Sequence, residues 1–82
     1  MSDSPSVVLV EEIRVEALRQ LDLATSAEEL EDWRLRYLGR KGRLTQVLRG
    51  VGALSPDERR RVGSEANHAK IMLEERVDSR QR

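Results

Sequence analysis

The chain has 82 residues, no cysteine, one Trp, one Tyr and no Phe, 37% charged residues and a formal net charge of zero at pH 7. This length and composition predict one small domain with a core of Leu, Val and Ala and without a large cavity. Without Cys, disulfides and thiolate metal sites are excluded. The sequence contains no signal-peptide or transmembrane run, so we expect a cytoplasmic, metal-free protein with no membrane partner.

The zero net charge hides a strong segregation of charge along the chain. Residues 1–32 sum to −7, residues 33–54 to +6, and residues 55–82 to +1. Helical surfaces usually intersperse both signs, because opposite charges four residues apart stabilise a helix. A stretch of 22 residues with six basic and no acidic side chains therefore favours a polyanionic partner.

In chain order, residues 1–6 predict a flexible start, and residues 7–24 predict an amphipathic helix. The apolar residues of this helix recur every three or four positions, at Val10, Ile13, Ala17, Leu21 and Ala24. At about 1.5 Å per residue the helix can lie beside residues 27 to about 40 and no further. We therefore expect three helices at the base of the molecule and two at its tip.

The next helix is predicted to begin at Ala27, because Ser26 and Glu29 have the spacing of a capping box. Its apolar residues follow a heptad pattern typical of a helix packed against a partner: Leu30, Trp33, Tyr37, Leu44, Val47 and Val51. Because the pattern stays in phase across Gly39 and Gly42, we interpret 30–51 as one helix. Whether the glycines bend it is left open. Leu35 and Leu38 suggest a second apolar face.

Gly50 and Gly52 are expected to end this helix in left-handed conformations. Ser55 as N-cap and Pro56 at the first helical position then predict a third helix that runs to near the C-terminus. Its apolar positions are Val62, Ala66, Ala69, Leu73 and either Arg76 or Val77. The predicted fold is all-α: a long, antiparallel, coiled-coil-like helical hairpin over 27–82, with the helix at 7–24 packed at its base.

In an antiparallel register Ala66 would lie opposite Arg40, between the two glycines. Small residues on both helices would then let their backbones approach closely, and the stem of Arg40 or Lys41 would fill one core position. Trp33 and Tyr37 lie at core spacing, which favours core packing over base stacking. His68 lies beside the apolar stripe, and a solvated surface histidine is the simpler interpretation. No residue set supports catalysis within the chain.

The run Gly39-Arg40-Lys41-Gly42 lacks the spacing of a Walker motif. Its two cations either contact phosphate or are solvated beside a close helix contact, and the sequence alone does not decide. Arg59, Arg60 and Arg61 are expected to reach the same tip from the facing helix. The predicted nucleic-acid-binding residues are Arg36, Arg40, Lys41, Arg43, Arg49 and Arg59. Base-specific readout is not expected, because no Asn or Gln accompanies these cations in a groove-reading arrangement.

The run YLGRKG over 37–42, followed by P-x-E-R over 56–59 and G-x-x-x-N-x-x-K over 63–70, resembles the N-terminal arm of the bacterial phenylalanyl-tRNA synthetase alpha subunit. The resemblance covers about 27–77 and implies a helical hairpin that contacts tRNA specific for phenylalanine. It also implies a class II enzyme of two alpha and two beta subunits that uses ATP and Mg²⁺ to attach phenylalanine to tRNA. Because the family's active site follows further along the chain, we expect these residues to be a non-catalytic fragment of a longer protein.

In this resemblance Arg40 and Lys41 match the basic pair of the family motif. The other four predicted binding residues come from the charge pattern alone. The alternative is a helical protein-protein interaction module without nucleic-acid binding, in which the cations serve solubility. A concentration-dependent dimer that does not bind nucleic acid would favour this alternative.

Overall fold

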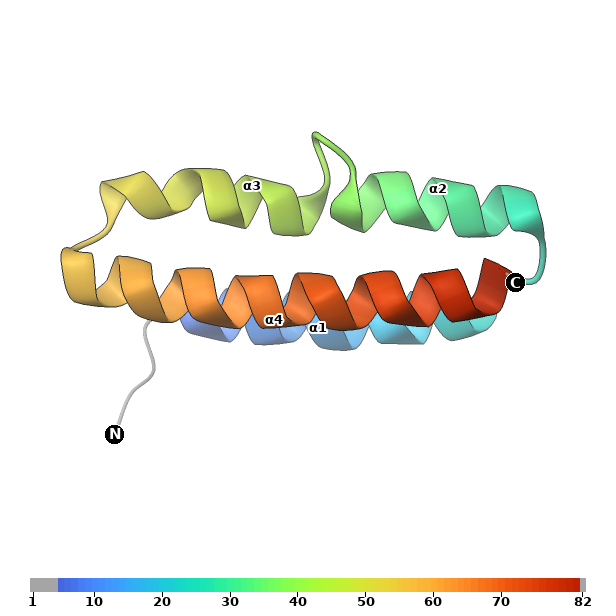
Figure 1. The fold of residues 1–82 in the computed structure, drawn as a ribbon, viewed down its shortest axis with the longest axis horizontal. Coiled ribbons are helices and arrows are strands. Elements are labelled where there is room, and N and C mark those ends of the chain that lie inside the picture. The colour runs from blue at the N-terminus through green and yellow to red at the C-terminus, as the bar shows by residue number, and fades with distance from the viewer. Residues whose placement is uncertain (1–4, 82) are drawn as a thin grey trace.

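The computed structural model describes residues 5–81. In this range the chain forms four α-helices and one short 3₁₀ helix, with no strand: α1 (Pro5–Leu23), α2 (Ala27–Leu38), α3 (Arg43–Gly50), η1 (Val51–Ala53) and α4 (Pro56–Gln81). α2 and α3 lie end to end along one side of α4, and α1 lies alongside α4 (Figure 1). The predicted all-α hairpin with an additional N-terminal helix is therefore confirmed.

The N-terminal helix begins earlier than the sequence predicted. Of the expected flexible start at 1–6, residues 1–4 lie outside the described part of the chain, and Pro5 and Ser6 belong to α1. Proline is accepted at the start of a helix because the first amides have no intrahelical partner there. α1 thus has 19 residues.

The core consists of the apolar stripes read from the sequence. Each helix contributes residues that are at most 6% exposed: Val10, Ile13, Ala17 and Leu21 from α1, Leu30, Trp33 and Tyr37 from α2, Leu44 from α3, and Val62, Ala66, Ala69, Leu73 and Val77 from α4. Leu35, in contrast, is 59% exposed. α1 and α4 both pack on the stripe that carries Trp33 and Tyr37, so the predicted second apolar face lacks a partner at Leu35.

The stretch from Leu30 to Val51 is two helices, and the prediction of one helix was wrong. α2 ends at Leu38, and Gly39 and Gly42 adopt extended backbone conformations with ψ of 176° and 159°. The four-residue turn projects away from α4, after which α3 resumes a similar direction (Figure 1). Tyr37 and Leu44 remain buried on either side, so the heptad phase survives although the helix does not.

The turn also changes how far α1 reaches. Residues 39–42 add little length along the axis, whereas α1 is about 28 Å long at 1.5 Å per residue. α1 therefore contacts α3 as well as α2, and Leu9 and Ile13 line a hollow together with Val47 of α3. The predicted two-helix tip was wrong over this region, because the turn shortens the opposite arm.

The serine caps at the starts of α2 and α4 agree with the predictions from the sequence, whereas the conformation at the end of α3 differs from the prediction. The amide of Glu29 donates to Ser26 Oγ at 3.1 Å, and the amide of Glu58 donates to Ser55 Oγ at 3.4 Å. Within residues 5–81 no glycine has a positive φ. α3 instead continues into the 3₁₀ helix η1, at whose end the Leu54 amide donates to Val51 O at 3.1 Å.

Two arginines connect the helices at the base. Arg34 of α2 pairs with Asp78 of α4 at 2.5 Å, and Arg80 donates to the carbonyl oxygens of Leu21 and Ala24 at 2.8 and 2.5 Å. These two carbonyls lie at and just after the C-terminal end of α1. Across residues 5–81, no helix combines the length and the apolar character required to cross a membrane.

Candidate nucleic-acid interface

The turn between α2 and α3 presents two cations at its centre. The amide of Gly42 donates to Gly39 O at 2.9 Å, which leaves Arg40 and Lys41 at the two central positions of a four-residue turn. The side-chain amide of Gln46 donates to Lys41 O at 2.9 Å. The turn is therefore closed by its own backbone and held by the first turn of α3.

Glycine is required at both ends of this turn by a close approach of the backbone. A Cβ on Gly42 would lie 2.6 Å from the carbonyl carbon of Tyr37, and one on Gly39 would lie 2.7 Å from Leu35 O. These nearest atoms belong to α2. The predicted reason for the glycines, close packing against Ala66, was therefore wrong: the turn folds back on the preceding helix.

Arg40 and Lys41 are exposed, and their side chains form no hydrogen bond or ion pair with the described residues. The expectation that one of their stems fills a core position was wrong. A turn that projects from the bundle (Figure 1) places both cations in solvent, where their charge remains available to an anion.

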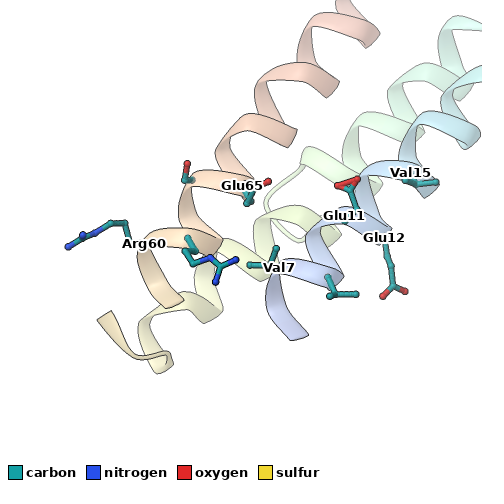
Figure 2. Close-up of a pocket in the computed structure, with 9 residues that line it drawn as sticks. Val7, Glu11, Glu12, Val15, Arg60 and Glu65 are labelled. Atoms are coloured by element: carbon teal, nitrogen blue, oxygen red, sulfur yellow. The ribbon is translucent and has the colours of Figure 1, made fainter. Parts of the chain in front are cut away.

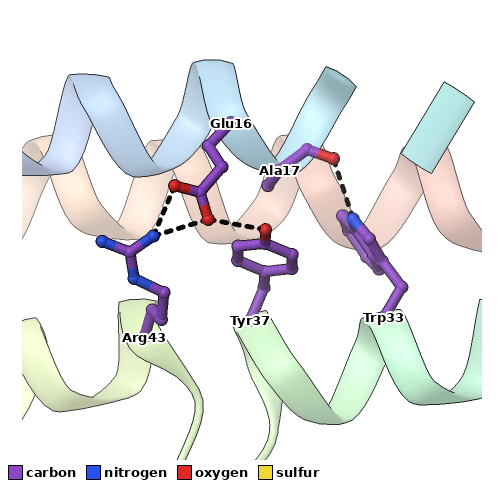
Figure 3. Close-up of polar contacts among 5 residues, drawn as sticks. All are labelled: Glu16, Ala17, Trp33, Tyr37 and Arg43. Carbon is purple, nitrogen blue, oxygen red and sulfur yellow. Dashed lines mark hydrogen bonds and ion pairs between the residues drawn. The ribbon is translucent and has the colours of Figure 1, made fainter. Parts of the chain in front are cut away.

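Arg43, directly after the turn, is engaged by α1. Its Nη1 lies 2.5 Å from both carboxylate oxygens of Glu16, and the hydroxyl of Tyr37 donates to Glu16 Oε2 at 2.7 Å (Figure 3). Trp33 Nε1 donates to Ala17 O at 2.8 Å in the same interface. The side chains that flank the basic turn are therefore tied to α1.

The electrostatics of this cluster follow from its hydrogen bonds. Arg43, and to a lesser extent the Tyr37 hydroxyl, lower the pKa of the Glu16 carboxyl. Burial, followed by the hydrogen bond to Glu16, raises the pKa of Tyr37. Both shifts favour the arrangement in which an ionised Glu16 accepts from Arg43 and from the neutral hydroxyl of Tyr37.

The basic stretch is partly neutralised by acids from other helices. Arg34 pairs with Asp78 of α4, and Arg43 pairs with Glu16 of α1. The sequence contains no acid between residues 33 and 54. The fold nevertheless places two acidic side chains from other helices against this stretch. The charge that remains available is therefore smaller than the sequence count indicated.

The remaining predicted site residues lie in two places. Arg36 is exposed on the last turn of α2, before the basic turn. Arg49 and Arg59 are exposed near the tip, where Arg59 also lies 3.5 and 3.4 Å from Gly52 O and Leu54 O. The eight-residue α3, about 12 Å long, separates the two places. The structure thus brings Arg40 and Lys41 together and keeps them apart from the tip.

Sequence reasoning missed Glu16. It is an ordinary helix-surface acid next to the core residue Ala17, and nothing local distinguishes it from its neighbours Glu11 and Glu12. Only its long-range partners, 21 and 27 residues away, identify it. The available signal was the combination of an acid-free basic stretch with a glutamate on the helix predicted to pack against it.

A hollow of about 630 Å³ between α1 and α4 has a different character (Figure 2). Val7, Val8 and Val15 form its apolar part, and side chains of both charge signs surround them. Such a mixed lining is unsuited to a polyanion. Among residues 5–81, no group of three or more His, Asp or Glu side chains is placed to hold a metal ion.

Comparison with known proteins agrees with the motif over 37–70. Residues 25–82 match the family model described as aminoacyl tRNA synthetase class II, N-terminal domain. Three of the most similar curated relatives are phenylalanine-tRNA ligase alpha subunits: from Moorella thermoacetica, 56% identical over 66 residues; from Desulforamulus reducens, 49% over 65; and from Clostridium botulinum, 43% over 70. These matches cover 80%, 79% and 85% of this chain.

The chain spans about a fifth of the length of these relatives: 19% of the Moorella and Desulforamulus proteins and 21% of the Clostridium protein. No solved structure matches the chain significantly. The predicted resemblance to the arm of the alpha subunit is confirmed. From the family match, the chain belongs to the N-terminal domain family of class II aminoacyl-tRNA synthetases.

Proposed function

We propose that this domain binds tRNA through the basic turn at residues 39–42, by contacts to the phosphate backbone. The observation that supports the proposal is the pair Arg40 and Lys41, both exposed, adjacent and without a partner among the described residues. Exposed arginine and lysine contact phosphates without reading sequence. Arg36, Arg49 and Arg59 extend the proposed surface on either side.

We further propose that the domain serves a phenylalanine-tRNA ligase, as the names of its relatives suggest. In that enzyme it would act in the cytoplasm beside a beta subunit, hold phenylalanine-specific tRNA, and raise its effective concentration at a distant active site. Aminoacylation would use ATP and Mg²⁺. Residues 5–81 offer no acidic cluster for the metal, so we assign no chemical step to them.

The test measures, by fluorescence anisotropy at two salt concentrations, how tightly the 82-residue chain binds a phenylalanine-specific tRNA transcript. The double variant R40Q/K41Q should bind at least five-fold more weakly. Each lost phosphate contact should also flatten the plot of log affinity against log salt concentration by about 0.7 to 0.9.

The matched control is R19Q/R76Q, which removes the same net charge from exposed positions on α1 and α4. It should change affinity by less than two-fold. Equal losses of tRNA affinity in the two variants would show that only net charge matters, and would contradict a localised binding site. Absence of tRNA binding by the parent chain, together with concentration-dependent dimerisation, would instead favour the protein-protein interaction module.

A further inference from the structure

The two residues that flank the basic turn point away from it. Tyr37 lies two residues before the first residue of the turn, Gly39, and Arg43 directly follows the turn. Both side chains extend toward α1, while the connecting chain leaves on the opposite side (Figure 3). Both reach the same carboxylate. Glu16 accepts from Arg43 Nη1 at 2.5 Å and from the Tyr37 hydroxyl at 2.7 Å.

We infer that Glu16 is a positioning residue for RNA binding: by holding Tyr37 and Arg43 against α1, it fixes the direction in which Arg40 and Lys41 project. This inference rests on the proposed function. It gives Arg43 a role other than the predicted phosphate contact, because its guanidinium is engaged on the side of α1.

The physical reason is the entropy of a short turn. Ordering flexible residues on binding costs backbone entropy, and a turn fixed beforehand avoids part of that cost. One end is anchored because Tyr37 is only 1% exposed in the core. The chain after the turn is anchored by Leu44, which is also 1% exposed. The pair of Arg43 and Glu16, whose side chains are 45% and 44% exposed, adds a contact that holds the residue between the turn and Leu44 against α1.

Such an exposed pair contributes little to global stability. Its loss should therefore affect RNA binding more than folding. Simple electrostatics predicts the opposite sign for binding: removing an acid near a cationic surface should strengthen attraction to a polyanion. The direction of the change thus separates positioning from a general charge effect.

The first experiment compares E16Q with E12Q in tRNA binding by the 82-residue chain. Both variants remove one negative charge from α1, and Glu12 is exposed one helical turn earlier. E16Q keeps a group that can accept from Tyr37 and loses the ionic contact with Arg43. We expect three- to ten-fold weaker binding for E16Q, and unchanged or tighter binding for E12Q. Tighter binding for E16Q would overturn the inference.

The second experiment reverses the pair. R43E should bind tRNA more weakly, and adding E16R should restore at least half of the lost free energy of binding, because the contact is remade with opposite polarity. A double variant as weak as R43E would overturn the inference and support direct phosphate contact by Arg43. Thermal unfolding, followed by circular dichroism, verifies that each variant is folded.

If E16Q does not fold, Y37F tests the other contact of Glu16 without a change of charge. It removes the second bond to Glu16, and weaker tRNA binding is expected; unchanged binding would contradict the inference. Failure of the inference is distinguishable from failure of the proposed function. In the first case the parent chain binds tRNA and R40Q/K41Q weakens it; in the second, the parent chain does not bind.

Discussion

Gly42 is one of two residues at which the basic turn cannot accommodate a side chain. A Cβ there would lie within 3 Å of three backbone atoms of Tyr37 and Leu38, so G42A forces the turn away from α2. We expect a loss of about 1 to 3 kcal/mol in the free energy of unfolding, the range for overpacked sites. Urea unfolding measures it.

Gly63 supplies the control for this prediction. It lies inside α4, and nothing within 4 Å would meet an added Cβ. G63A should therefore stabilise the chain by about 0.5 to 1 kcal/mol, because glycine loses more backbone entropy in a helix than alanine does. Destabilisation by both variants would indicate that the turn at Gly42 has no special constraint.

Glu16 also makes a prediction about pH. Its pKa is lowered in the folded chain, chiefly by Arg43. A carboxyl with a depressed pKa stabilises the fold above its unfolded pKa of about 4.5 and loses that contribution as pH falls through the lower folded value. The melting temperature should therefore fall less in E16Q than in the parent between about pH 6 and about pH 3. An equal fall in both would show that the contact contributes nothing.

At this scale, apolar residues were predictable and long-range polar partners were not. Trp33 and Tyr37 recur with the period of the core, and both are buried. Arg43 was predicted as a phosphate ligand from local charge alone. Its contact with Glu16 crosses 27 residues, and no local pattern encodes which acid of α1 lies opposite it.

At the scale of elements, the heptad pattern was informative about packing and misleading about continuity. The heptad pattern depends only on the spacing of apolar residues along the chain. A four-residue turn that leaves the bundle and returns to it keeps that spacing, so the pattern does not reveal the break. Both glycines were visible in the sequence, but their requirement arises from backbone contacts with α2, which appear only after the chain has folded back. The ends of α2 and α4 marked by serine caps were predictable, because the caps act within one turn.

Arg80 adds polar contacts at the C-terminal end of α1 to the apolar packing that docks this helix. Arg80 of α4 donates to the carbonyl oxygens of Leu21 and Ala24, which lie at and just after the end of α1, where the last carbonyls lack the usual amide partner four residues on. Leu21 O also accepts from the Ala24 amide at 3.2 Å. R80Q should lower the free energy of unfolding by about 1 kcal/mol, near the value of one net hydrogen bond. It should also increase amide exchange at the end of α1. R76Q, at an exposed position of α4, is the control and should leave both unchanged.

For the whole molecule, the segregation of charge seen in the sequence becomes a division of surfaces. The acid-rich α1 neutralises Arg43, and α4 neutralises Arg34, whereas the turn keeps Arg40 and Lys41 free of such partners among residues 5–81. The fold thus concentrates the available positive charge at the turn and near the tip. A charge count along the chain predicted the sign of this surface, and packing determines its location.

The family match begins at residue 25 and leaves α1 outside it, yet α1 covers the aromatic core. Val10, Ile13, Ala17 and Leu21 are each at most 3% exposed, and Trp33 donates its indole N–H to Ala17 O. A chain of residues 25–82 should therefore expose Trp33 and unfold at lower urea than the whole chain, with red-shifted tryptophan emission. Adding a peptide of residues 5–24 should shift the emission back, because it restores the apolar surface. Equal unfolding midpoints for both chains would show that the hairpin folds without α1. The contacts of Glu16 with Tyr37 and Arg43 would then be an addition to an arm that is stable by itself.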